Sequence, residues 1–335
     1  MTRVGVFLGK YSIARWKTKL FFSFSHPSLE QDILGIHFQN PVGLAAGFDK
    51  DALLTDILLH VGFGFEEVGS ITGEECAGNK GLRLWRLKKS KALVVNYGLK
   101  NDGCEKIAER LKNKKFKIPI GTNIAKTNSP ETVDTEAGVN DYMKAFSEFT
   151  NIGDYFVINI SCPNAFGGEP FTDTTKLDFL LKEIDKIETK KPIFLKISPD
   201  LNEKQVEDIL NVCEHHRING FVCSNLTKNR DNTKIKDSTA SCKGGISGKV
   251  VDDLSTKQIR FIYQKTKGKY TIIGCGGIFS AEDAYKKIKA GASLVELITG
   301  MIFEGPQLIN EINRGLVFLL QKDGFKNLNE AIGRG

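Results

Sequence analysis

Eight short apolar runs, each separated from the next by a segment with helical spacing, constrain the fold of this chain most strongly. The runs predict strands over residues 41–46, 65–69, 118–124, 155–160, 192–197, 220–224, 270–274 and 294–297. The segments between them predict helices over residues 53–61, 105–112, 139–149, 177–187, 203–215, 251–266 and 281–290. Eight strand–helix units in a row are typical of a closed parallel barrel. We therefore predict an α/β fold, a single (β/α)8 TIM barrel with a short N-terminal helical extension.

The predicted domain division is a basic and aromatic helical extension over residues 1–33 and the barrel over residues 34–335. A length of 335 residues suits one barrel with additions. Two segments, residues 71–104 and 225–248, are too long for plain loops, and long loops at strand ends usually carry function. The net charge of +7 comes partly from the first 29 residues, which contain no acid. The remainder is nearly balanced, so we expect no nucleic-acid partner.

Residues 1–29 allow three interpretations. They could form an amphipathic helix on a membrane surface, a helix that caps the bottom of the domain, or an organelle-targeting peptide. No apolar run is long enough to span a bilayer. The expected location is therefore the cytoplasm or the cytoplasmic face of a membrane, with organelle targeting as the third interpretation. The seven scattered cysteines form no Cys-x-x-Cys pair, so we expect no metal site and reduced thiols.

Polar side chains gather where the predicted strands end, which is where barrel enzymes carry catalytic groups. The clearest stretch is Asn159-Ile160-Ser161-Cys162-Pro163-Asn164, directly after an apolar run. A thiol acts as a base or nucleophile once its pKa is lowered, and amides offer donors and acceptors to a planar ligand. The structural alternative is a small buried cysteine beside two turn asparagines.

The other strand ends form a set rich in amides and lysines and poor in acids. It suits a large planar ligand with an anionic group, and it lacks the paired carboxylates, Ser–His relay or metal ligands of a hydrolase. Glycine-rich turns at residues 274–277 and 298–300 follow the seventh and eighth strands, where barrels commonly bind phosphate. Lys196 ends an apolar strand, so its ammonium needs an anionic partner, either a ligand or a structural acid. Lys50 has the same two interpretations, because Asp49 and Asp51 flank it.

These residues closely resemble one family, the FMN-dependent dihydroorotate dehydrogenases. The matching motifs span about residues 34–312 and include residues 40–50, 121–124, 159–164, 196–200, 244–248, 272–278 and 291–295. They are most similar to the class 2 branch, whose members are membrane-associated and reduce quinones.

The resemblance implies FMN over the strand ends, a pyrimidine-like substrate and a second electron acceptor, either a quinone or a soluble molecule. The implied FMN contacts are Ala46, Gly47, Lys50, Ser70, Asn123, Asn159, Lys196, Ser224, Gly248, Gly276, Gly277, Ile298, Thr299 and Gly300. The implied substrate contacts are Lys50, Asn96, Tyr97, Gly98, Leu99, Asn159, Asn164 and Asn225. Cys162 falls at the position of the catalytic base, so it would take the C5 proton of dihydroorotate while C6 gives a hydride to flavin N5.

Four features depart from the class 2 pattern. Cysteine at the base position is typical of the soluble class 1, whereas class 2 usually has serine there. Val95 stands where the family has asparagine, with Asn96 one residue late. Leu226 follows Asn225 where the family has threonine or serine. The N-terminal extension is also shorter than the two-helix domain of class 2.

Three alternatives stay open, and the departures at Val95 and Leu226 favour the first of them. The chain could be a related FMN-dependent oxidoreductase that acts on another small unsaturated ring or acid. It could be a flavin-binding barrel without turnover. It could also be a membrane-surface protein whose barrel is a scaffold. The oligomeric state is left open by the sequence.

Overall fold

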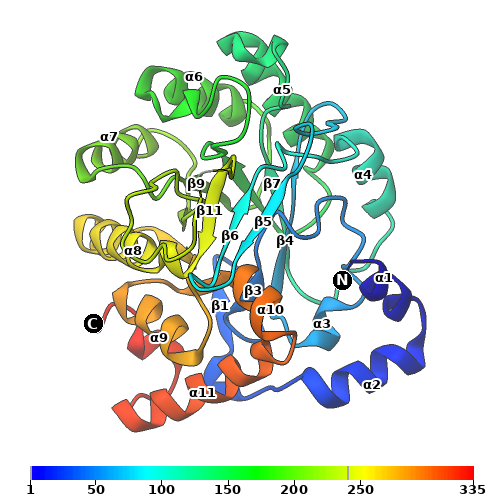
Figure 1. Ribbon diagram of the computed structural model, residues 1–335, viewed down its shortest axis with the longest axis vertical. Helices are drawn as coiled ribbons and strands as arrows, with labels where there is room; N and C mark the ends of the chain where they lie inside the picture. The colour runs from blue at the N-terminus through cyan, green and yellow to red at the C-terminus, as the bar shows by residue number, and fades with distance from the viewer. Residues whose placement is uncertain (1, 240) are drawn as a thin grey trace.

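The computed structural model describes residues 2–239 and 241–335, and its centre is a closed barrel of eight parallel strands (Figure 1). In chain order these are β3 (Val42–Leu44), β4 (Phe65–Ile71), β7 (Ile120–Ile124), β8 (Tyr155–Asn159), β9 (Ile193–Ile197), β10 (Gly220–Cys223), β12 (Thr271–Cys275) and β13 (Leu294–Leu297). The barrel closes where Val295 of β13 pairs with Val42 of β3. The predicted fold class is confirmed, and each predicted strand overlaps one of the eight.

Helices surround the barrel (Figure 1). They are α3 (Leu58–Val61), α4 (Cys104–Leu111), α5 (Thr135–Glu148), α6 (Thr174–Asp185), α7 (Glu203–Cys213), α8 (Asp252–Thr266), α9 (Ala281–Ala290), α10 (Thr299–Glu304), α11 (Leu308–Asp323) and α12 (Leu328–Ala331). The helix predicted over residues 53–61 is only the single turn α3. The Asp49 carboxylate accepts hydrogen bonds from the backbone N–H groups of Leu53 (2.9 Å) and Leu54 (2.6 Å). This local bonding holds the preceding segment in a turn instead of a helix.

The lower half of the barrel is filled by large apolar side chains. A hairpin of β1 (Gln31–Ile33) and β2 (Ile36–Phe38) lies below the barrel and inserts Phe38 against Phe65, with ring centres 5.5 Å apart. Tyr155 and Phe194 form a second edge-to-face pair in the same layer. The predicted boundary between residues 33 and 34 falls in the turn of this hairpin.

A second sheet, not predicted from the sequence, is built from the two long segments. It consists of β5 (Leu84–Leu87), β6 (Ala92–Val95) and β11 (Gly245–Gly248), in the order β11-β6-β5. Figure 1 shows these strands crossing in front of the barrel strands. Their antiparallel pairing joins segments about 150 residues apart, as where Gly245 faces Val95.

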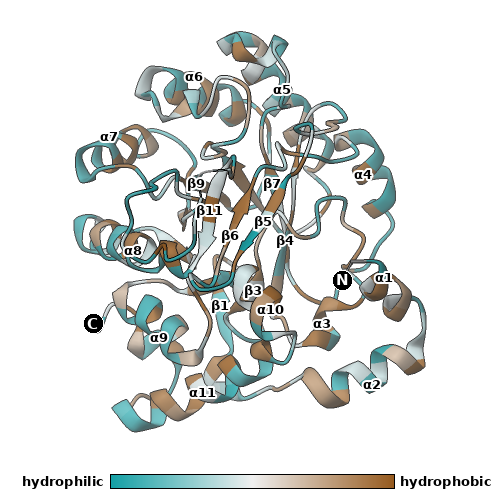
Figure 2. Cartoon of the chain, in the orientation of Figure 1, coloured by the Kyte–Doolittle hydropathy of each residue, from teal (hydrophilic) through white to brown (hydrophobic). Residues whose placement is uncertain are grey.

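The N-terminal extension contains two helices, α1 (Thr2–Lys10) and α2 (Ser12–Phe22), beside α3 at the periphery of the barrel (Figure 1). The interpretation as a cap under the barrel is wrong, because the β1–β2 hairpin occupies that position. Both helices contain hydrophobic stretches (Figure 2), and several of their apolar side chains are exposed. Phe7, Trp16 and Phe21 are 58%, 63% and 71% exposed. Within the described residues, no helix is long and apolar enough to cross a membrane.

The apolar layer makes a direct prediction about stability. Replacing the fully buried Phe65 with alanine should lower the free energy of unfolding by about 3–5 kcal/mol, because the substitution leaves a cavity under the barrel. Phe318→Ala is the matched control, since Phe318 is 64% exposed, and it should change stability by less than about 0.5 kcal/mol. Urea denaturation of both variants measures the difference. Equal losses would contradict the packing described here.

Candidate active site

A cavity of about 630 Å³ opens over the carboxyl ends of the barrel strands and under the second sheet. Its volume is typical of sites that hold a cofactor or a drug-sized ligand. Most of the residues singled out in the sequence line it, namely Ala46, Gly47, Lys50, Ser70, Tyr97, Gly98, Leu99, Asn159, Cys162, Asn164, Lys196, Ser224, Asn225, Gly248, Gly276, Gly277, Ile298, Thr299 and Gly300. Asn96 and Asn123 are outside its wall.

The floor of the cavity is a charged layer directly above the apolar one. Lys196 is buried, and its Nζ lies 3.1 Å from Oε2 of Glu67 and 3.4 Å from Oε2 of Glu296. Burial opposes the charge on Lys196, but the two neighbouring carboxyl groups outweigh that effect and raise the pKa of this lysine. Lys196 therefore pairs with structural acids, as one of its two interpretations expected. It also lines the cavity, where a ligand would meet it.

Asn123 links this charged layer to the cavity wall. Its Nδ2 donates to Oε2 of Glu67 at 3.0 Å, and its Oδ1 accepts a hydrogen bond from the Ser70 hydroxyl. Nδ2 of Asn159 donates to the same Ser70 oxygen at 2.9 Å. Asn123 therefore stands behind Ser70 and holds it, instead of facing the cavity itself.

The amide planes of Asn159, at the end of β8, and Asn225, after β10, are fixed by hydrogen bonds before any ligand binds. Oδ1 of Asn159 accepts from the backbone N–H (3.1 Å) and the hydroxyl (3.0 Å) of Ser161. Nδ2 of Asn225 donates to the Ser161 carbonyl at 2.9 Å, and its Oδ1 accepts from the Leu226 N–H. Groups held in this way lose little conformational entropy when a ligand binds.

The wall near Val95 differs from what the family pattern implies. The Asn96 amide accepts a hydrogen bond from Asn79 at 2.9 Å, while Val95 lines the cavity in its place. Nδ2 of Asn164 donates to the Val95 carbonyl at 2.9 Å, and its Oδ1 accepts from the Gly245 N–H. Leu226 also lines the cavity. This edge of the site is therefore apolar at both positions, Val95 and Leu226, that depart from the family pattern.

Cys162 lies on the wall with two lysines nearby. Burial raises the pKa of its thiol to about 11, although the Asn164 backbone N–H and the charges of Lys126 and Lys50 act in the opposite direction. Burial lowers the pKa of Lys50 to about 8. Lys50 donates to the Gly47 carbonyl, and its Nζ lies 4.7 Å from the centre of the Tyr97 ring.

A structural ion pair between Lys50 and its flanking acids is not found among the described residues. The Asp49 carboxylate is occupied by the backbone of residues 53 and 54, and Asp51 accepts from the Asp102 N–H at 2.9 Å. Lys50 is therefore available to an anionic ligand.

The glycine-rich end of the cavity has close backbone approaches. Gly248, Gly276 and Gly277 have φ values of +97°, +119° and +78°, which side chains rarely adopt. A Cβ atom at Gly277 would overlap Asp252. The buried Ser224 hydroxyl faces the cavity and has no hydrogen-bond partner among the described residues. These features are typical of a phosphate and ring cradle.

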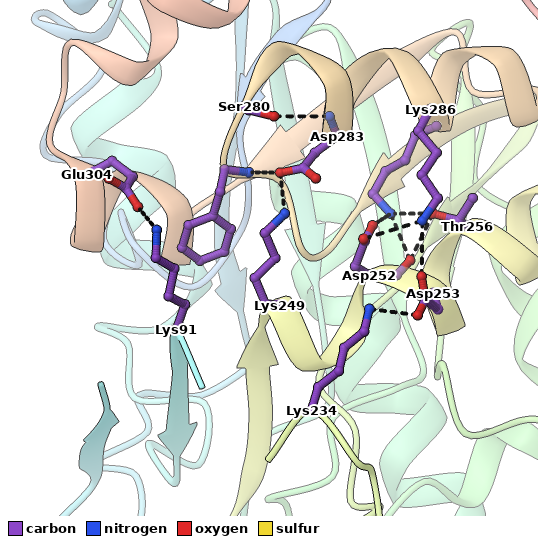
Figure 3. Close-up of polar contacts among 12 residues, drawn as sticks. Lys91, Lys234, Lys249, Asp252, Asp253, Thr256, Ser280, Asp283, Lys286 and Glu304 are labelled. Carbon is purple, nitrogen blue, oxygen red and sulfur yellow. Dashed lines mark hydrogen bonds and ion pairs between the residues drawn. The ribbon is translucent and has the colours of Figure 1, made fainter. Parts of the chain in front are cut away.

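Ion pairs fix the elements that carry this end of the site (Figure 3). Lys249, directly after β11, pairs with Asp283 of α9. Lys91, beside β6, pairs with Glu304 of α10 at 2.7 Å. Lys286 of α9 bridges to Asp252 and Asp253 at the start of α8, and Lys234 also binds Asp253. In residues 2–239 and 241–335, no cluster of His, Cys, Asp or Glu could hold a metal ion.

Comparison with known proteins identifies the family. The sequence profile described as dihydroorotate dehydrogenase matches residues 28–320, which is most of the chain. The chain belongs to the dihydroorotate dehydrogenase family. It is an enzyme of that family, an oxidoreductase that acts on a CH–CH donor, as the resemblance implied.

Individual members are similar over nearly their whole length. The dihydroorotate dehydrogenase (quinone) of Trichodesmium erythraeum is 40% identical over 323 residues, covering 93% of this chain and 85% of the relative. The protein of the same name from Haloarcula marismortui is 40% identical over 312 residues, covering 93% and 87%. A crystal structure of DHODH from Eimeria tenella in complex with ferulenol matches with a TM-score of 0.86 at 30% identity, covering 96% and 93%.

Several residues at the site were missed in the sequence. Glu67 and Glu296 are acids inside apolar strands, and that placement was an available signal for a buried charge. Arg86, Leu93 and Ser247 line the cavity from the second sheet, so no strand-end argument could find them.

The raised thiol pKa predicts slow alkylation of Cys162 at neutral pH. The rate with iodoacetamide should rise about tenfold per pH unit up to roughly pH 10, because only the thiolate reacts. Mass spectrometry of the peptide that contains Cys162 measures the rate. Lys126→Met should slow it at each pH, since Lys126 lowers the thiol pKa. A rate that already levels off near pH 8 would contradict this description.

Proposed function

We propose that this enzyme binds FMN, oxidises dihydroorotate to orotate and passes the electrons to a quinone. The observation that carries the proposal is the pairing of a charged floor at Lys196 with a thiol at Cys162 across one cavity. The family membership and the names of the two relatives support the reaction and the acceptor.

The residues present suit FMN. The glycine turns at Gly248, Gly276 and Gly277 offer open backbone to a phosphate, and the Ser224 hydroxyl, which has no partner within the described part of the chain, offers a hydrogen bond to a ring. Bound FMN would supply the hydride acceptor at N5 and an electron carrier to the second substrate. The remaining cofactor contacts are those that the resemblance implies, with Asn123 acting through Ser70.

Lys196 would lie under the part of the flavin that gains negative charge when the ring is reduced. A buried ammonium stabilises such a charge far more than water does, because the surrounding dielectric is low. The carboxyl groups of Glu67 and Glu296 hold this ammonium in one position.

Cys162 Sγ would take the C5 proton of dihydroorotate as the thiolate, after its own proton has left to solvent. Its thiol is protonated at neutral pH without a ligand, since burial raises its pKa to about 11. Lys50 and Lys126 favour the thiolate, so both contribute to its formation. Lys50 would also pair with the substrate carboxylate, while Asn159, Asn164 and Asn225 would orient the ring.

Apolar side chains in the cavity wall suit a quinone. They include Phe48, Leu53, Leu84, Leu93 and Ile302. Leu84 and Leu53 are 37% and 40% exposed, so this apolar lining reaches solvent. A lipophilic acceptor would contact these side chains as it enters.

A second candidate function follows from the apolar edge formed by Val95 and Leu226. These side chains cannot hydrogen-bond a pyrimidine, and each lost bond to a buried polar ligand costs roughly 1–3 kcal/mol. The alternative is an FMN-dependent oxidation or reduction of another small unsaturated ring or acid. A substrate panel separates the two candidates.

Dihydroorotate should bleach the yellow protein rapidly under anaerobic conditions. Cys162→Ala should slow this step by about 100- to 10,000-fold, the usual contribution of a positioned base. Cys162→Ser is the conservative control and should recover part of the rate at high pH. Stopped-flow absorbance measures all three proteins. A yellow protein that does not bleach would sink the dihydroorotate assignment and favour the second candidate.

We also propose that α1 and α2 contact a membrane surface, since they combine exposed aromatic residues with basic ones. Replacing Phe7, Trp16 and Phe21 together with serine should reduce binding to anionic phospholipid vesicles at least tenfold. Each aromatic residue contributes up to about 1.5–3 kcal/mol when it leaves water, and about 1.4 kcal/mol is a tenfold change. Phe318→Ser is the matched control from α11. Cosedimentation that is equal for all variants would contradict the proposal.

A further inference from the structure

The charged floor contains more acid than one lysine can neutralise. Glu67, Lys196 and Glu296 come from three different strands, and all three side chains are 4% exposed or less. One ammonium can balance only one carboxylate in such a low-dielectric interior. A second ionised carboxylate so close to the first would be strongly disfavoured.

The two carboxyl groups are held differently. Glu67 accepts hydrogen bonds from both Lys196 (3.1 Å) and Asn123 (3.0 Å). Glu296 accepts only from Lys196, at 3.4 Å, so it lacks the second donor that Asn123 gives to Glu67, and Oε1 of both carboxyl groups has no partner among the described residues. Because Glu67 has more hydrogen-bond donors, we infer that Glu67 is the carboxylate and that Glu296 is the carboxylic acid. Burial and the neighbouring Glu67 raise the pKa of Glu296 well above its ordinary value.

We propose that Glu67 and Glu296 share one proton beneath the flavin, and that loss of this proton makes the flavin harder to reduce. Glu67 and Glu296 are thus positioning residues that act through Lys196. The inference rests on the proposed binding of FMN but not on the identity of the oxidised substrate. While the proton is held, the layer is neutral and Lys196 can balance the charge that the flavin gains. Once the proton leaves, an added negative charge opposes reduction.

The other groups around this layer do not titrate first. Tyr155 from β8 and Cys275 from β12 face the two carboxyl groups. Burial raises the pKa of Tyr155 well above its ordinary value and that of Cys275 to about 12. Lys196 stays charged because its pKa is raised by the carboxyl groups. The first proton that the charged layer loses as the pH rises is therefore the one that Glu67 and Glu296 share.

The test is the midpoint potential of FMN bound to the full chain, measured with redox mediators at several pH values. The unaltered protein should show an additional fall in potential as the pH rises through the raised pKa of Glu296. Glu296→Gln and Glu67→Gln should each remove that fall and leave the potential at neutral pH nearly unchanged, because either remaining carboxylate neutralises Lys196. The double Gln variant should shift the neutral-pH potential to a more positive value. A tenfold change in the two-electron equilibrium corresponds to about 30 mV.

Two outcomes would overturn the inference. If Glu296→Gln alone raised the potential at neutral pH, both carboxylates would be ionised and no proton would be shared. If no variant altered the potential or its pH dependence, the layer would not act on the flavin. Dihydroorotate is absent from this measurement, so failure of the substrate assignment would leave its result intact.

Thermal unfolding of the full chain, with and without FMN, provides a second reading. The folded protein keeps the shared proton where an unfolded glutamate, with an ordinary pKa near 4.5, has lost it. Stability should therefore fall as pH rises from about 4.5 toward the raised pKa of the folded state. Glu296→Gln should remove this part of the pH dependence. An unfolding temperature with the same pH dependence in both proteins would contradict the shared proton, even if FMN did not bind.

Discussion

The buried ammonium of Lys196 between Glu67 and Glu296 is the interaction on which the site depends. It separates the apolar lower barrel, with Phe65 and Tyr155, from the polar cavity above. A charge at this depth is stable only with good partners, because desolvation of an isolated ion costs several kcal/mol. The same requirement places a fixed positive charge directly under any ring that occupies the cavity.

Hydrogen bonds connect the charged layer around Lys196 to the residues that would contact the substrate. Glu67 holds Asn123, which holds Ser70, and Ser70 accepts from Asn159. The opposite side is closed by the second sheet and by ion pairs such as Lys249 with Asp283 (Figure 3). The site is therefore organised before a ligand binds, as electrostatic catalysis requires.

The barrel could be predicted because the alternation of strands and helices follows from short-range patterns of apolar and polar residues. All eight barrel strands and the strand-end positions of Lys196 and Cys162 follow from that pattern. The second sheet could not, because β6 and β11 pair across about 150 residues and their segments are short. The orientation of Asn96 toward Asn79, and the pairing of Lys196 with two acids, depend on tertiary contacts that spacing does not encode.

A crystal structure of the enzyme with FMN and orotate would test the account most directly. We expect the flavin ring over Lys196, the phosphate in the turns at Gly248, Gly276 and Gly277, and orotate between the ring and Cys162. Sγ of Cys162 should lie in contact with C5 of orotate, and Val95 and Leu226 should face the ring without hydrogen bonds. Flavin bound elsewhere, or orotate with C5 out of reach of Cys162, would contradict the central claim.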